Sequence, residues 1–163
     1  MPRQSRAARR ADRRSPKMAV QRNRPYGNYN FLVIIDGVEV GGFAEVIIPG
    51  IVIDVIEFRN GNDPENAVRK IPGLAKYPDV TLKRGIVGAL ALYDWVNDVR
   101  NGDAGANRNV AIQLQNEFRN EIVWTWLLHR AWPSQYSFGP LNAKGKDLAM
   151  EELTLTYERL DIE

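Results

Sequence analysis

Residues 29–40 have the sequence YNFLVIIDGVEV, in which a run of aromatic and β-branched residues is interrupted by Asp36-Gly37. Such residues favour extended strands, and an Asp-Gly pair between two apolar runs is a typical two-residue hairpin turn. The stretch therefore predicts a strand over residues 29–36 and the start of its return strand over 38–40. A tight hairpin of this kind indicates an antiparallel β-sheet.

The flanking sequence continues the pattern. Further strands are predicted over residues 43–48, 51–59, 80–85, 109–115, 121–130 and 150–161. Neither face of 51–59 is cleanly polar, so we expect a bulge near Val55 or an assembly that covers both faces. About seven strands indicate an antiparallel β-sandwich or barrel, in an α+β, mainly β domain that spans residues 25–163.

One helix is predicted to flank these strands, over residues 89–100. There the apolar residues recur at three- and four-residue steps, and Asn101-Gly102 supplies a stop signal. Within this helix, Trp95 fits a core anchor better than a platform for a ligand.

Residues 60–79 contain Asn60, Gly61, Asn62, Asp63, Pro64, Pro72, Gly73 and Pro78, which predicts a connection of about 20 residues. Irregular loops of that length are unusual in compact domains unless they have a function. We interpret the segment as a contact loop, with a disordered flap as the alternative. Its basic and apolar centre consists of Arg69, Lys70, Ile71, Pro72, Gly73, Leu74, Lys76 and Tyr77.

Residues 1–24 form a basic arm with a net charge of +8, because nine cations face the single carboxylate of Asp12. The cations are Arg3, Arg6, Arg9, Arg10, Arg13, Arg14, Lys17, Arg22 and Arg24. Such a segment cannot bury enough apolar surface to offset the entropy of ordering it. It is either a clamp for an acidic surface or nucleic acid, or a solvated tail, or sequence upstream of a true start at Met18.

Composition excludes several kinds of enzyme. The 163 residues include no cysteine and one histidine, which removes disulfides, zinc-thiolate sites, cysteine nucleophiles and multi-histidine metal sites. His129 fits a strand residue better than a general base, and the phosphate-binding glycine motifs are missing from the sequence. We therefore expect no catalytic residues, no metal, no cofactor and no membrane anchor, in a protein assembled in the cytoplasm.

Many segments, in this order, resemble the inner tube protein of contractile phage tails and related contractile injection systems. The carrying segments include residues 25–31 (PYGNYNF), 56–59 (IEFR), 69–77 (RKIPGLAKY), 81–85 (TLKRG), 92–95 (LYDW), 132–133 (WP), 141–145 (LNAKG) and 151–155 (EELTL). The resemblance covers roughly residues 25–160.

This resemblance implies a structural subunit that forms hexameric rings, stacked into a hollow tube inside a sheath. In such a tube we expect the loop over residues 60–79 to be a contact between rings. Each subunit would give four strands to a 24-stranded barrel around the lumen. The implied partners are further copies of the chain, a sheath protein, baseplate and cap proteins, and a protein cargo or DNA in the lumen. The arm departs from the family pattern, so a nucleic-acid-binding module that uses the arm stays open as an alternative.

Overall fold

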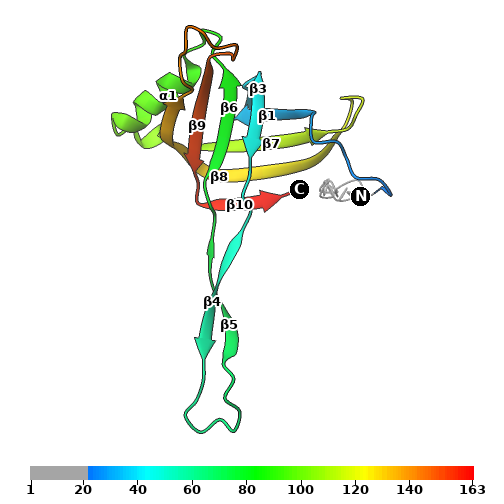
Figure 1. Cartoon of the computed structure of the whole chain (residues 1–163), viewed down its shortest axis with the longest axis vertical. Helices are drawn as coiled ribbons and strands as arrows, with labels where there is room; N and C mark the ends of the chain where they lie inside the picture. The colour runs from blue at the N-terminus through cyan, green and yellow to red at the C-terminus, as the bar shows by residue number, and fades with distance from the viewer. Residues whose placement is uncertain (1–21) are drawn as a thin grey trace, which may run out of the picture.

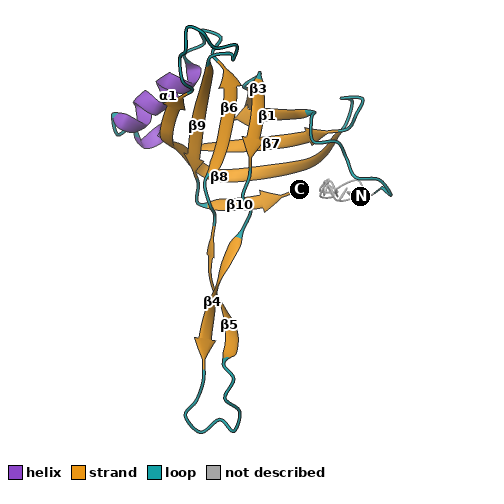
Figure 2. Cartoon of the chain, viewed as in Figure 1, coloured by secondary structure: helices purple, strands orange, loops and turns teal. Residues whose placement is uncertain are grey.

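The computed structural model describes residues 22–163 and shows a mainly β chain with one α-helix (Figures 1 and 2). The helix α1 spans Ala91–Arg100, and a short 3-10 helix, η1, spans Ala104–Ala106. The strands are β1 (Phe31–Ile35), β2 (Val38–Glu39), β3 (Phe43–Ile47), β4 (Val52–Phe58), β5 (Arg69–Lys76), β6 (Val80–Gly85), β7 (Arg108–Gln115), β8 (Ile122–Phe138), β9 (Met150–Thr156) and β10 (Arg159–Ile162). Every strand pair among them is antiparallel, which confirms the predicted fold class, although the count of about seven strands was too low.

Two layers of strands make up the body of the molecule. The β7 layer has the order β2-β1-β7-β8-β10, and the β9 layer has the order β3-β6-β9-β8. In Figure 1 the strands of one layer cross those of the other at a steep angle. The body is therefore an orthogonally packed sandwich, in which strands that change layer form the corners.

Strand β8 makes such a corner because it belongs to both layers. Its first part pairs with β7 as far as Ala131, and its second part pairs with β9 from Trp132 onward. Arg130, just before this change of partner, has a φ of +53°. The register with β7 shifts between Leu128 and Ala131, and the register with β9 shifts between Pro133 and Gln135. The sequence predicted that this strand ends at Arg130, but the chain bends there and continues to Phe138.

The core lies between the two layers and under the helix. Val33, Val110, Ile112 and Leu128 contribute from the β7 layer. The β9 layer and α1 contribute further fully buried side chains, namely Val80, Leu82, Leu153, Leu155 and Trp95. Trp95 is 1% exposed and its indole Nε1 donates to the carbonyl of Ala106 at 2.6 Å, which confirms that it is a core anchor.

The C-terminal segment, predicted as one strand over 150–161, is divided into β9 and β10. The chain turns at Tyr157-Glu158, where the amide of Glu158 donates to the carbonyl of His129 at 3.0 Å. Because β9 pairs with β6 whereas β10 pairs with β8, the last strand changes layer. The alternation of side chains predicted both halves but gave no sign of this corner.

The connection over residues 60–79 was predicted wrongly as one irregular loop. Residues 69–76 form β5, which pairs with β4 in a two-stranded sheet of its own. Pro72 and Gly73 normally interrupt strands, but a two-stranded sheet has only edge strands, in which proline is tolerated. The irregular parts are residues 59–68, at the tip of the hairpin, and residues 77–79, between β5 and β6.

Candidate assembly surfaces

The β4–β5 hairpin extends away from the sandwich as a narrow two-stranded arm (Figure 1). Both of its faces expose apolar side chains to solvent. The exposed fractions are 56% for Ile53, 62% for Val55, 52% for Ile56 and 47% for Phe58 on β4. Two strands are marginal in water by themselves, and an apolar surface of this kind marks an interaction site.

A bulge divides the hairpin near the position predicted from the sequence. The register shifts between Ile53 and Val55, and the extra residue belongs to β5, which advances from Pro72 to Ala75 over the same interval. A Cβ on Gly73 would lie 3.1 Å from the carbonyl oxygen of Asp54 and 3.2 Å from Cγ1 of Ile56. Gly73 therefore allows the two strands to approach closely beside the bulge.

A single guanidinium organises the hairpin tip. Arg59 donates to the carbonyls of Asp63 and Glu65 at 3.2 and 3.1 Å, and to the side chain of Asn66 at 3.1 Å. Arg69 lies 3.6 Å from the carboxylate of Asp63. The tip is thus a folded loop with its own hydrogen bonds.

The predicted contact residues lie together on this hairpin. Arg69, Lys70, Ile71, Pro72, Gly73, Leu74 and Lys76 are on β5, and Tyr77 follows it, with its ring 6.0 Å from that of Tyr157. Sequence analysis missed the apolar residues of β4 as part of the same surface. The signal was present, since neither face of 51–59 was polar enough for an isolated strand.

The β9 layer has two unpaired edges within the described part of the chain. At one side β3 pairs only with β6, and at the other side residues 132–138 of β8 pair only with β9. Unpaired edges of this length invite a further strand from another chain.

The face of the β9 layer that points away from the core is polar. Lys83 lies between two carboxylates from the neighbouring strands, 3.4 Å from Glu45 and 3.8 Å from Glu152. The next level across the sheet contains Ile47, Thr81, Thr154 and Gln135, which are paired in that order. Apart from Ile47, the residues of these two levels are polar or charged.

A buried ion pair crosses the opposite, core-facing side of this layer. The guanidinium of Arg84 on β6 donates to Glu151 on β9, and the hydroxyl of Tyr136 on β8 donates to the same carboxylate. Burial, together with the hydrogen bond to Glu151, raises the pKa of Tyr136 to about 12. Because Arg84 and Glu151 are each 4% exposed, the pair links three strands inside the core.

The last part of the basic arm is attached to its own chain. Arg22 donates to both carboxylate oxygens of Glu117, at 2.6 and 3.0 Å, and lies 3.7 Å from the centre of the Tyr26 ring. The hydrogen bonds from Arg22 lower the pKa of Glu117 to about 2. Arg24 is exposed, and Arg3, Arg6, Arg9, Arg10, Arg13, Arg14 and Lys17 lie outside the described residues.

His129 lies on β8, as a strand residue, 2.8 Å from the carboxylate of Asp161. Arg159 donates to the other oxygen of that carboxylate, and this hydrogen bond lowers the pKa of Asp161.

Between residues 22 and 163 no group of His, Asp or Glu side chains could hold a metal ion. Within the same range no helix is long and apolar enough to cross a membrane.

Comparison with solved structures shows close similarity to proteins of contractile injection systems. A chain of the sheath-tube complex of an extracellular contractile injection system, PVC, in its extended state, is 27% identical, with a TM-score of 0.77 over 86% of this chain and 93% of that chain. A chain of the anti-feeding prophage cap is 28% identical, with a TM-score of 0.77 over 90% of this chain and 94% of that chain. A chain from the virion of a gene transfer agent, at 8% identity and a TM-score of 0.59 over 85% of this chain and 99% of that chain, shares the fold.

A search of the curated proteins finds no match. The family model described as T4-like virus tail tube protein gp19 matches residues 27–161, which is nearly all of the described chain. The chain therefore belongs to the tail tube family and is a structural subunit of a contractile tail or tail-like particle.

Proposed function

We propose that this tail tube subunit closes into rings of six copies, and that the rings stack into a hollow tube. The observation that carries the proposal is the pair of unpaired edges, β3 and residues 132–138 of β8, on opposite sides of a four-stranded layer. If β3 of one copy pairs with β8 of the next, each interface joins two unlike surfaces. Interfaces of this heterologous type generate a ring when the rotation between successive copies closes, as we propose it does here.

The dimensions of such a ring follow from the strand count. Four strands from each of six copies give a barrel of 24 strands. At about 4.8 Å per strand and a tilt of about 35°, the backbone diameter is roughly 45 Å. Side chains would leave an opening of about 30–40 Å, with the polar face of the β9 layer around it. A protein cargo or DNA would pass along this surface.

The hairpin is proposed to reach the next ring along the tube. Its apolar faces lie at one end of the molecule, and the connections 86–90 and 139–149 lie at the opposite end (Figure 1). These connections also expose apolar side chains, with Val87 76%, Leu141 85% and Leu148 82% exposed. Stacked copies would bring the two apolar ends together and remove both from water.

The proposed partners follow from the similar structures. These include a sheath-tube complex, a sheath and tube terminator, a baseplate and a tube-terminating cap. We propose that this chain likewise assembles with sheath, baseplate and cap proteins. We also propose that it has no catalytic activity, which rests on the structural role of the family.

Negative-stain imaging of the purified protein tests the ring. We expect six-fold rings or tubes with an opening of about 30–40 Å, formed without nucleic acid. Protein that stays monomeric at high concentration would refute the proposal. Assembly that requires added duplex, and that salt abolishes, would instead favour the nucleic-acid-binding alternative.

A further inference from the structure

An exposed aromatic side chain lies on the turn between β7 and β8. Phe118 is 82% exposed, the largest such fraction among the aromatic residues of the described chain. A fully exposed phenyl ring gains nothing for the fold of the monomer, whereas aromatic anchors are enriched at the centres of protein interfaces.

The turn that carries Phe118 is held firmly. Asn30, which is 4% exposed, donates from its side chain to the carbonyls of Asn116 and Glu117, at 3.2 and 3.4 Å. The side-chain oxygen of Asn30 accepts a hydrogen bond of 2.9 Å from Arg119. Arg22 holds Glu117 from the other side. The residues on both sides of Phe118 are therefore fixed, which lowers the entropy cost of using this ring in a contact.

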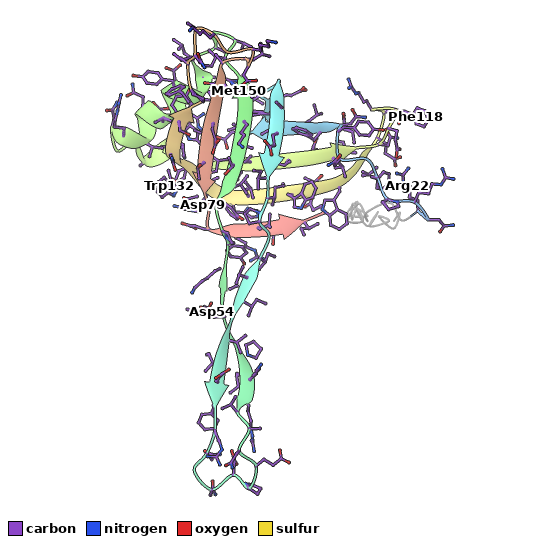
Figure 3. All side chains as sticks on the ribbon, in the orientation of Figure 1. Arg22, Asp54, Asp79, Phe118, Trp132 and Met150 are labelled. Atoms are coloured by element: carbon purple, nitrogen blue, oxygen red, sulfur yellow. The ribbon has the colours of Figure 1, made fainter. Side chains whose placement is uncertain are left out.

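The turn extends past the edge of the β9 layer. Strand β8 begins at Ile122, next to the turn, and enters the β9 layer ten residues later, at Trp132. Ten residues of extended chain span roughly 33 Å. In Figure 3, Phe118 and Arg22 lie on one flank, beyond β3, and Figure 1 shows α1 on the opposite flank. Phe118 therefore cannot reach α1 of its own chain.

The outward side of α1 offers a matching surface. Tyr93 is 42% exposed, and its hydroxyl lies 3.4 Å from Arg100, which also donates to Asn97. Asp94 is exposed beside it. Two further carboxylates lie at this end of the molecule, namely Asp98, which is 3.3 Å from Arg108, and Asp103, which accepts from the amide of Gly105. The surface thus combines an aromatic ring with acidic groups.

The charges near the β7–β8 turn and near α1 are of opposite sign. The basic arm, with its net charge of +8, enters the described structure at Arg22, directly beside the turn. Cations near the turn of one copy would attract the carboxylates beside α1 of another copy.

We propose that the β7–β8 turn of one copy docks on α1 of the next copy around the ring, with Phe118 packed against Tyr93. The inference rests on the proposed ring, because joining β3 to β8 of the next copy places unlike flanks side by side. Neighbouring copies would then have two contacts, the strand pairing of the β9 layer and the packing of the β7–β8 turn on α1.

Cysteine cross-linking tests this contact, and the natural chain has no cysteine that would interfere. The double variant Phe118→Cys with Tyr93→Cys is assembled, imaged by negative stain and treated with a short bismaleimide. We expect a ladder of covalent oligomers that ends at six. The single variants Phe118→Cys and Tyr93→Cys serve as matched controls and should give no ladder, because the contact joins unlike surfaces.

The result also separates this inference from the proposed function. Closed rings that give no ladder with the double variant would overturn the contact between the turn and α1 while leaving the ring intact. Failure of the unmodified protein to form rings would refute the ring itself. As a second measurement, Phe118→Ala should raise the concentration needed for assembly several-fold without changing the thermal unfolding of the monomer. Phe118→Trp keeps an aromatic ring and should assemble at the concentration that the wild-type protein needs.

Discussion

Arg22 and Glu117 are 95 residues apart in the sequence, yet the guanidinium of one holds both carboxylate oxygens of the other. This bidentate geometry suits arginine, whose planar fork matches a carboxylate. It fixes the point at which the basic arm leaves the domain.

Removal of residues 1–17 should leave the domain folded, because Arg22, Glu117 and the whole core remain. We expect rings or tubes of the truncated protein to dissociate at lower salt, since the lost interactions are collective and screened by ions. Sedimentation across a salt series measures this. If the truncated protein kept its salt resistance but lost bound DNA or cargo, the arm would act on the lumen contents.

Acid should release the Arg22 anchor only at low pH. The hydrogen bonds from Arg22 lower the pKa of Glu117 from 4.5 to about 2, so the folded protein holds this carboxylate ionised more strongly than the unfolded chain does. The stabilisation is therefore fully present above about pH 4.5 and is lost as the pH falls towards 2. Comparing the thermal unfolding of the wild-type protein and Glu117→Gln over this range checks the sign, because their difference should shrink as the pH falls.

The buried ion pair of Arg84 and Glu151 should be costly to break from one side. Arg84→Met leaves the Glu151 carboxylate buried without its cation, which we expect to cost about 3–5 kcal/mol of stability. The double variant Arg84→Met with Glu151→Leu should recover part of the loss, since apolar replacements fill the same volume while the hydroxyl of Tyr136 loses its acceptor. Urea unfolding of the three proteins measures the coupling, and equal losses in the single and double variants would contradict it.

Substitutions on the hairpin should separate stacking from folding. Ile56→Asp places a charge on an exposed apolar face, so we expect normal rings that no longer stack and an unchanged circular dichroism spectrum. Glu57→Gln, on the opposite face of the same strand, is the matched control. Tubes of normal length from Ile56→Asp would show that the hairpin is not the contact between rings.

Gly73→Val tests the bulge. The new side chain would meet Asp54 and Ile56 closer than ordinary van der Waals contact, so the two strands must separate locally. We expect lost stacking and a global unfolding temperature within a few degrees of wild type, because the hairpin lies outside the core. A large drop in that temperature would show that the hairpin and the sandwich unfold together.

The sequence predicted correctly those strands, turns and helices whose formation depends mainly on their own residues. Asp36-Gly37 forms the predicted turn, with φ values of +49° and +78°, and residues 80–85 form a strand with the predicted bounds. Strand β5 was missed because Pro72 and Gly73 are local strand breakers, and only pairing with β4 overrides them.

Which side chains are buried and which are exposed was harder to predict from the sequence than the strands were. A phenylalanine such as Phe118 is expected in a core, and a pair such as Arg84 and Glu151 is expected at a surface, yet the structure reverses both expectations. The reversal depends on contacts between distant segments, which single-residue preferences do not encode. The basic arm, by contrast, was visible from composition alone.

The passage of β8 through both layers has a mechanical consequence. One continuous strand of 17 residues joins the polar wall of the β9 layer to the β7 layer behind it. A force that pulls the two layers apart must break the hydrogen bonds of β8 in at least one layer, because the peptide chain itself continues from one layer into the other. The backbone of this one strand therefore transmits a push on the β7 layer directly to the β9 layer.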